Sequence, residues 1–187
     1  MKNILLKGVD MSKIEVPFTK YLDKTVEIMR DPGLLLVSVD KDGQPNVMAI
    51  GWGLIGVIWR KPVFIVAVRP SRYTYKLIEE TGDFTVNVPS KDMSDIVEYC
   101  GTVSGRDHDK FKEKNLKAVP SKYVKSPIID QCLINYECKV IYKTKLEPAI
   151  IPRDVKSLFY PGNDYHTLYF GEIQIVHVDE EAITKKL

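Results

Sequence analysis

The chain has 187 residues, 44% of them apolar and 28% charged, which is the composition of a folded globular domain and argues against wholesale disorder. Its 27 lysines and arginines nearly balance 25 aspartates and glutamates, so the net charge of +2 gives no reason to expect nucleic acid or an acidic membrane as the main partner. The longest apolar stretch, Ala49–Trp59, is well short of the roughly 20 residues that span a bilayer. We expect one domain over residues 1–187.

Two features predict a cytoplasmic location. The apolar run within Met1–Asp10 is too short for a signal peptide. Cys100, Cys132 and Cys138 form an odd, sparse set, which is typical of reduced thiols in the cytoplasm rather than of a disulfide scaffold.

The first elements are a helix and a hairpin. Apolar residues recur at helical spacing over Phe18–Met29, and Pro32-Gly33 ends this helix. The short apolar run Leu34–Val39 predicts a strand, followed by the turn Asp40–Gly43 and a returning strand over Asn46–Trp52.

A second strand–helix–strand unit follows. The β-branched run Val63–Val68 predicts a strand entered through a turn at Arg60–Pro62. Ser71 is then a suitable N-cap for a helix that runs to Glu80, and Phe84–Val88 is the next strand.

The middle of the chain is more polar. We predict a helix over Lys91–Tyr99, with Ser90 as its cap and Gly101 just past its end. The stretch Arg106–Leu116 is expected to be a loop with a short helical turn.

Two long strands dominate the C-terminal part. Thr167–Val178 is the last strand, with Gly171 as a bulge. Cys132–Lys145 alternates, which is typical of a half-buried antiparallel strand. Its apolar face carries Ile134, Tyr136, Cys138, Val140 and Tyr142, and its polar face carries Asn135, Glu137, Lys139 and Lys143. Because strands outnumber helices, we predict a mainly β fold: a closed or nearly closed antiparallel barrel with flanking helices.

A glycine motif in the first half has a structural interpretation. Gly51–Gly56 matches G-x-G-x-x-G, which in dinucleotide-binding domains opens a helix. Here the glycines run into the β-branched, aromatic and Pro-terminated segment Val57–Pro62, where no helix fits. We therefore interpret the glycines as bends in a sheet.

The turn Arg69–Thr74 is a candidate anion site. It lies where a strand feeds a helix, and it contains two arginines, a serine and a threonine. A helix N-terminus, hydroxyls and guanidinium groups together suit a phosphate. The alternative is an ordinary capped helix with solvated arginines.

The chain offers little for metal or nucleophilic chemistry. His108, His166 and His177 lack metal-ligand spacing, and no nucleophile motif is present. The small-residue loop Cys100–Arg106 suits a close approach to an anion or an aromatic ring. A bound cofactor is therefore the expected carrier of any chemistry, and we assign no catalytic side chain and no metal.

Five segments then occur in a characteristic order: Gly43–Trp52, Val68–Thr74, Phe84–Pro89, Cys100–Lys110 and His166–Glu172. Together they resemble the flavin reductase-like family of FMN-binding split barrels, which includes flavoredoxins and archaeal ferric reductases. The resemblance covers roughly Asp31–Asp179 and leaves the preceding residues without a functional account.

The resemblance implies an antiparallel Greek-key split β-barrel that forms a homodimer and holds FMN near the subunit interface. Asn46–Trp52 would lie along the isoalloxazine ring, and Arg69–Thr74 would surround the phosphate. The residues that the resemblance assigns to FMN are Asn46, Val47, Met48, Ala49, Ile50, Trp52, Arg69, Ser71, Arg72, Thr74, Asn87, Cys100, Gly101, Ser104, Gly105, Lys110, His166 and Phe170.

The function that the resemblance implies is a flavin-dependent oxidoreductase. NAD(P)H would reduce FMN, which would pass electrons to free flavin, ferric iron or a partner protein. Two alternatives stay open, because no nicotinamide-binding motif is recognisable: a flavoredoxin-type electron carrier that does not use nicotinamide, and a non-catalytic flavin-binding protein. Another cofactor on the same barrel, such as pyridoxal phosphate or haem, is a smaller alternative.

Overall fold

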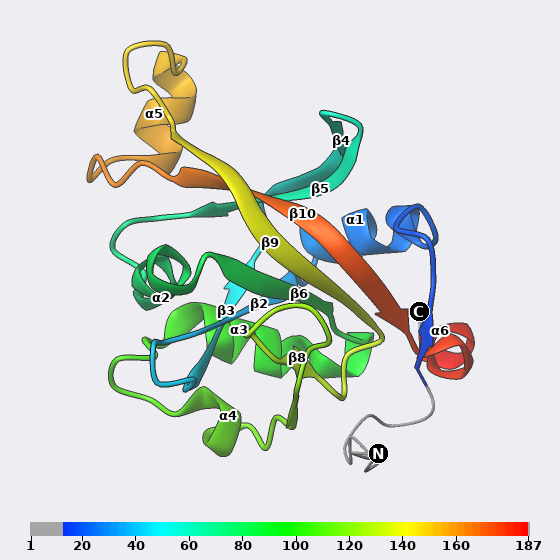
Figure 1. Ribbon diagram of the computed structural model, residues 1–187. Helices are drawn as coiled ribbons and strands as arrows, with labels where there is room; N and C mark the ends of the chain where they lie inside the picture. Colours follow the sequence, from blue (N-terminus) through cyan, green and yellow to red (C-terminus); the bar gives the residue numbers. More distant parts are fainter. Residues whose placement is uncertain (1–12, 187) are drawn as a thin grey trace.

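The computed structural model describes residues 13–186 of the chain (Figure 1). The expectation about a signal peptide concerns Met1–Asp10 and lies outside the described residues. The strands are β1 (Ile14–Glu15), β2 (Leu34–Val39), β3 (Pro45–Ile50), β4 (Gly53–Ile58), β5 (Lys61–Val68), β6 (Asp83–Val88), β7 (Ala118–Val119), β8 (Ile128–Ile129), β9 (Ile134–Lys145) and β10 (Thr167–Val178). The helices are α1 (Leu22–Arg30), α2 (Tyr73–Thr81), the 3₁₀ turn η1 (Lys91–Met93), α3 (Ser94–Thr102), α4 (Lys110–Glu113), α5 (Arg153–Phe159) and α6 (Glu180–Lys186).

One antiparallel sheet organises the molecule. Its strands follow the order β3-β2-β6-β9-β10-β5-β4, with β1 paired to β10 beside this path. The long strands β9 and β10 cross its centre, and α5 stands beyond one end of this pair (Figure 1). All pairings among the described strands are antiparallel, which confirms the prediction of a mainly β antiparallel fold.

A glycine allows β10 to bend across its neighbours. The register between β9 and β10 shifts at Phe170/Gly171, as the predicted bulge requires. A side chain at Gly171 would overlap the ring of Phe84, so the close approach of β10 to β6 depends on this glycine.

The sheet separates two apolar clusters. Leu34 and Leu36 of β2 join the larger cluster inside the curved sheet, which includes Phe84. Leu35 and Val37 face the opposite side and pack with residues of α3 and α4. Because β2 is buried on both faces, its sequence is a continuous apolar run rather than an alternating one.

The prediction of a half-buried β9 is wrong for the first half of the strand, where the polar face is buried as well. Asn135 and Glu137 are fully buried. The segment before β9 folds over them, and the backbone N–H groups of Lys122 and Tyr123 donate to the Glu137 carboxylate. Polar residues can therefore be buried here because every one of them finds a partner.

Several predicted boundaries need correction. Helix α1 begins at Leu22 rather than Phe18, since Tyr21 adopts a left-handed backbone with φ of 64°. Gly101 lies inside α3 and not past its end. Ser90 precedes η1 and makes no side-chain capping bond.

The region after the hairpin β2–β3 contains a strand and no helix. The glycine segment becomes edge strand β4, which confirms that Gly51–Gly56 is not a dinucleotide fingerprint. The turn into β5 uses Trp59 and Arg60, both at positive φ, and Pro62 already pairs within the sheet. The prediction of a turn at Arg60–Pro62 is therefore wrong by about one residue. In the part of the chain that is described, no helix has the length and apolar character needed to cross a membrane.

Candidate functional site

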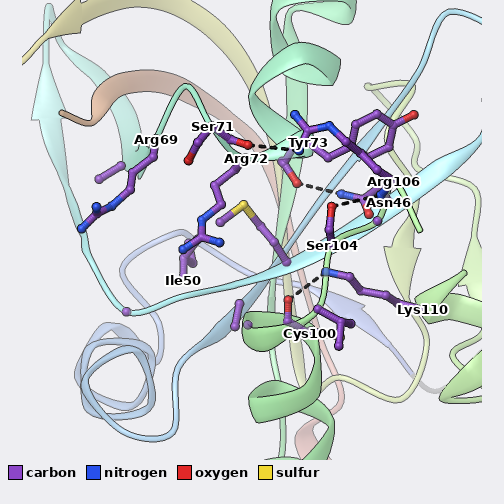
Figure 2. A pocket seen from close by; sticks show the side chains of 18 of the residues that line it. Asn46, Ile50, Arg69, Ser71, Arg72, Tyr73, Cys100, Ser104, Arg106 and Lys110 are labelled. Carbon is purple, nitrogen blue, oxygen red and sulfur yellow. Dashed lines mark hydrogen bonds between the residues drawn. The ribbon is translucent and has the colours of Figure 1, made fainter. Parts of the chain in front are cut away.

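A pocket of about 250 Å³ lies where three segments meet: the end of β3, the turn from β5 into α2, and the loop from α3 to α4 (Figure 2). Fifteen of the residues predicted from the sequence line it, although they come from distant parts of the chain. They are Asn46, Met48, Ala49, Ile50, Trp52, Arg69, Ser71, Arg72, Thr74, Cys100, Gly101, Ser104, Gly105, Lys110 and His166.

The turn between β5 and α2 places two arginines at the pocket in different ways. Arg69 donates to the carbonyl oxygen of Phe159 at 2.8 Å, so its guanidinium anchors the end of α5. The side chain of Arg72 makes no hydrogen bond or ion pair with any described residue, and it extends from the turn toward Ile50 (Figure 2). Arg72 is therefore the guanidinium that remains available to a ligand.

The prediction that Ser71 caps α2 is wrong. The N-cap position is Arg72, and no side chain caps the helix. The Ser71 hydroxyl instead donates to the carboxylate of Asp164, a residue of the segment between β9 and β10. The backbone N–H groups of the first turn of α2 thus have no side-chain cap.

Lys110 is a buried ammonium without a counter-ion. Its side chain is 4% exposed, and its Nζ donates to the carbonyl oxygens of Val47 and Cys100, each at 2.9 Å. No acidic side chain among the described residues pairs with it. Burial lowers the pKa of Lys110, the Cys100 thiol opposes this effect and the Arg72 charge adds to it. Since an ammonium has three N–H donors, one remains for a ligand.

Small residues let the backbone pack closely around the pocket. A side chain at Gly105 would overlap the amide of Asn46, whose Nδ2 donates to Thr74 Oγ1 at 2.7 Å. A methyl group at Gly101 would lie 3.3 Å from the Cβ of Ala49. The loop after α3 therefore approaches β3 as closely as glycine allows.

Cys100 lines the pocket as a neutral thiol. It is 1% exposed, and burial raises its pKa to about 11 against the opposing charges of Lys110 and Lys114. A thiol with this pKa is a poor nucleophile near neutral pH. Cys100, Cys132 and Cys138 are all free and buried, and the last two are core residues as predicted.

An aromatic group closes another side of the pocket. The ring of Trp52 lies 4.8 Å from that of His166 and meets Phe159 edge-on at 5.2 Å. His166 Nδ1 is 2.8 Å from the hydroxyl of Tyr160. Burial, helped by Arg69 and Arg72 and opposed by Asp164, lowers the pKa of His166 to about 4, so its ring is neutral at pH 7.

Three predicted residues do not line the pocket. The Val47 side chain is buried in the cluster between β3 and α3. Asn87 is fully buried, donating to Leu35 O and accepting from Ile129 N and Asn135 Nδ2. The Phe170 ring packs against Tyr142. The structure places these three side chains outside the pocket lining, in the core, in a buried polar network and against Tyr142, and their contact with FMN stays a prediction.

Other residues at the site were not assigned from the sequence. Arg106 donates to Ser71 O at 3.1 Å and lies over the ring of Tyr73. Tyr160 and Asp164 belong to the segment between β9 and β10, which carries no periodic pattern. Only the position of Arg106, within the small-residue loop, offered a sequence signal.

The chain is similar to known proteins over most of its length. A family model described as the flavin reductase like domain matches residues 31–187. An uncharacterized protein of Archaeoglobus fulgidus is 35% identical over 147 residues, which cover 78% of this chain and 71% of that protein.

Two solved structures extend the comparison. The flavoredoxin of Desulfovibrio vulgaris (Miyazaki F) is 32% identical with a TM-score of 0.65, covering 81% of this chain and 71% of its own. A Shewanella frigidimarina protein described as a flavin reductase with a split barrel domain is 18% identical with a TM-score of 0.65, covering 88% of this chain and 78% of its own, and shows the fold alone. The predicted split barrel is confirmed.

Proposed function

This chain belongs to the flavin reductase-like family, and from that premise we propose that it binds FMN in the pocket and acts as a flavin-dependent oxidoreductase. NAD(P)H would donate the electrons, and free flavin, ferric iron or a partner protein would accept them. The D. vulgaris relative is a flavoredoxin, and the similarity of this chain to it supports a role in electron transfer.

The observation that carries the proposal is the uncompensated positive charge of the pocket. Within residues 13–186, Lys110 is buried without an acidic partner, and the Arg72 guanidinium forms no ion pair. Removing a charge from water is costly unless a counter-ion replaces the lost solvation. A phosphate bound between Lys110, Arg72 and the uncapped start of α2 supplies that counter-ion.

The rest of the pocket fits a flat, largely apolar ring. Met48, Ala49 and Ile50 line it from β3, and Trp52 and His166 close it on the side of Arg69. FMN has both a phosphate and a fused aromatic ring, so it matches both the cationic groups and the apolar lining of the pocket. FMN supplies hydride and one-electron chemistry when bound. The chain itself binds and orients the flavin and limits the access of water.

No side chain needs to act as a catalyst in this proposal. The Cys100 thiol is neutral and His166 is uncharged, so neither offers a strong nucleophile or acid. Among the described residues, no group of three or more His, Cys, Asp or Glu side chains could hold a metal ion.

Steady-state oxidation of NADH and NADPH, with and without added FMN and ferric iron, tests the electron donor. If the protein is a reductase, it should oxidise at least one nicotinamide in a flavin-dependent manner. The second candidate, a flavoredoxin-type carrier, is favoured by the 32% identity to flavoredoxin. It predicts no oxidation of either nicotinamide, although dithionite reduces the bound flavin.

We also propose that the protein is a homodimer. Leu54, Val57 and Trp59 on edge strand β4 are 66%, 66% and 61% exposed, and Tyr142 beside Trp59 is 48% exposed. Leu54 and Val57 lie on opposite faces of β4, and exposed apolar side chains on an edge strand favour association. Because β4 begins directly after Trp52, a second copy at this edge strand would lie next to the pocket.

A further inference from the structure

Tyr160 and His166 form a buried pair on the side of the pocket where Arg69 lies. The two side chains are 5% and 8% exposed, and the Tyr160 hydroxyl is 2.8 Å from His166 Nδ1. Tyr160 directly follows α5 and His166 directly precedes β10, so the segment between β9 and β10 supplies both.

The hydrogen bond can form with the proton on either partner. If Tyr160 donates to Nδ1, the neutral ring of His166 carries its proton on Nε2. If Nδ1–H donates instead, the buried Tyr160 proton has no acceptor among the described residues. An unsatisfied buried donor costs about 1–3 kcal/mol. The first arrangement is therefore favoured.

Burial keeps the ring of His166 neutral, and two nearby arginines add to this effect. Arg69 lies 5.3 Å from the centre of the Tyr160 ring, and Arg69 and Arg72 both oppose a positive charge on His166. Asp164 acts in the opposite direction, and burial outweighs it. Trp52, the other neighbour of the ring, carries no charge.

His166 Nε2 then has no hydrogen-bond partner among residues 13–186. The ring makes one hydrogen bond among the described residues, through Nδ1, and it lines the pocket. Lys110 and Ser104 lie on the opposite side of the pocket from Arg69 (Figure 2). Lys110 and this neutral N–H donor therefore lie on different sides of one pocket, and Arg72 is near enough to both to affect their pKa values.

We propose that Tyr160 is a positioning residue that holds His166 as the neutral Nε2–H tautomer, so that His166 donates a hydrogen bond to a carbonyl oxygen or ring nitrogen of the bound ring. This inference rests on the proposed function, since a flavin provides that ring. The pyrimidine-dione ring of an oxidised flavin has two carbonyl oxygens and one unprotonated nitrogen that accept hydrogen bonds, and the central ring adds a second unprotonated nitrogen.

The tautomer is measured on the ligand-free protein by long-range ¹H–¹⁵N correlation of ¹⁵N-labelled histidine, with His166→Gln to assign the signals. The expected result for the wild type is a protonated Nε2 and an unprotonated Nδ1. Tyr160→Phe keeps the ring but removes the hydroxyl, and it should produce a mixture of tautomers. Tyr165→Phe is the matched control, because Tyr165 stacks on Tyr160 at 4.9 Å while its hydroxyl donates to Asn163. A wild-type signal from Nδ1–H would overturn the inference.

The second measurement is the affinity for riboflavin, which has the ring but no phosphate. Tyr160→Phe should weaken the binding of riboflavin and of FMN by the same factor, which is the inverse of the fraction of His166 that keeps the Nε2–H tautomer, or about twofold for an even mixture. Tyr165→Phe should leave both affinities unchanged. His166→Gln, which keeps an N–H donor, should bind riboflavin more tightly than His166→Leu.

Failure of this inference can be distinguished from failure of the proposed function. Unchanged riboflavin affinity in Tyr160→Phe, together with equal affinities in the two His166 variants, would overturn the inference while FMN binding stands. A wild-type protein that binds no flavin would instead overturn the proposed function, whereas the tautomer is measured without any ligand.

Discussion

The polar groups around the pocket differ in what they already contact. The Arg69 guanidinium is bonded to Phe159 O, and the Ser71 hydroxyl is bonded to Asp164. The Arg72 guanidinium has no hydrogen-bond partner among the described residues, and the Lys110 ammonium donates only to two carbonyl oxygens. The turn Arg69–Thr74 was expected to act as one phosphate site, but the structure separates its anchoring residues from the ones that remain available.

Arg72→Ala should weaken the binding of FMN about ten- to a hundredfold, because a charge-assisted hydrogen bond contributes roughly 1.5–3 kcal/mol. The binding of riboflavin, which has no phosphate, should barely change. Ser71→Ala should have a smaller effect, since its hydroxyl donates to Asp164. Flavin fluorescence titrations of both ligands measure this. Equal losses for FMN and riboflavin in Arg72→Ala would show that the phosphate binds elsewhere.

Cys100→Ser should keep bound FMN and most of its rate of reduction, because burial raises the pKa of this thiol to about 11 and leaves it protonated. Stopped-flow reduction by dithionite, or by a nicotinamide if one is active, measures the rate. Cys132→Ser, at another buried thiol outside the pocket lining, is the control. A hundredfold loss with FMN still bound corresponds to roughly 2.7 kcal/mol of barrier and would indicate that the thiol takes part.

At the scale of elements, the sequence predicted the features that depend on neighbouring residues. The apolar run of β2, the turn at Asp40–Gly43 and the bulge at Gly171 were all visible in the sequence, because they depend on neighbouring residues or on glycine itself. Ser71 and Asn135 were predicted wrongly, since their partners Asp164 and Asn87 are 93 and 48 residues away. The candidate site was found mainly through the resemblance, whereas the role of Tyr160 depends on a tertiary contact that no local pattern carries.

Strand β9 carries a buried carboxylate that should make stability depend on pH. Burial alone would raise the pKa of Glu137, but the His177 hydrogen bond and two backbone N–H groups hold it below its ordinary value. A lowered pKa stabilises the fold above the unfolded-state pKa of about 4.3, and this stabilisation is lost as the pH falls through the folded-state value.

Denaturant unfolding from about pH 6 down to pH 3 should therefore show a steeper loss of stability in the wild type than in Glu137→Gln. At about pH 6 the variant should be less stable by roughly 1.5–3 kcal/mol, since it loses charge-assisted hydrogen bonds. Parallel stability curves for the two proteins would contradict this account of β9.

On the scale of the whole molecule, one copy of the chain leaves apolar residues of edge strand β4 exposed to solvent. Leu54 and Val57 are each 66% exposed on an edge strand. Closed two-fold association buries the same surface of both copies and removes the exposed edge.

Light scattering at micromolar concentration should give about twice the chain mass of 21.4 kDa. Val57→Glu should shift the protein toward the monomer, because the interface would then bury a charge without a partner. Val26→Glu, at an exposed apolar residue of α1, is the control and should remain dimeric. A wild-type monomer with FMN bound would contradict the proposed dimer.

The central claim is that the pocket around Lys110 and Arg72 binds FMN, and titration of the purified chain with FMN, followed by flavin fluorescence, tests it most directly. The account predicts quenching that saturates at about one FMN per chain, with weaker binding of riboflavin because it lacks the phosphate. A protein that leaves FMN fluorescence unquenched, or binds riboflavin as tightly as FMN, would contradict it.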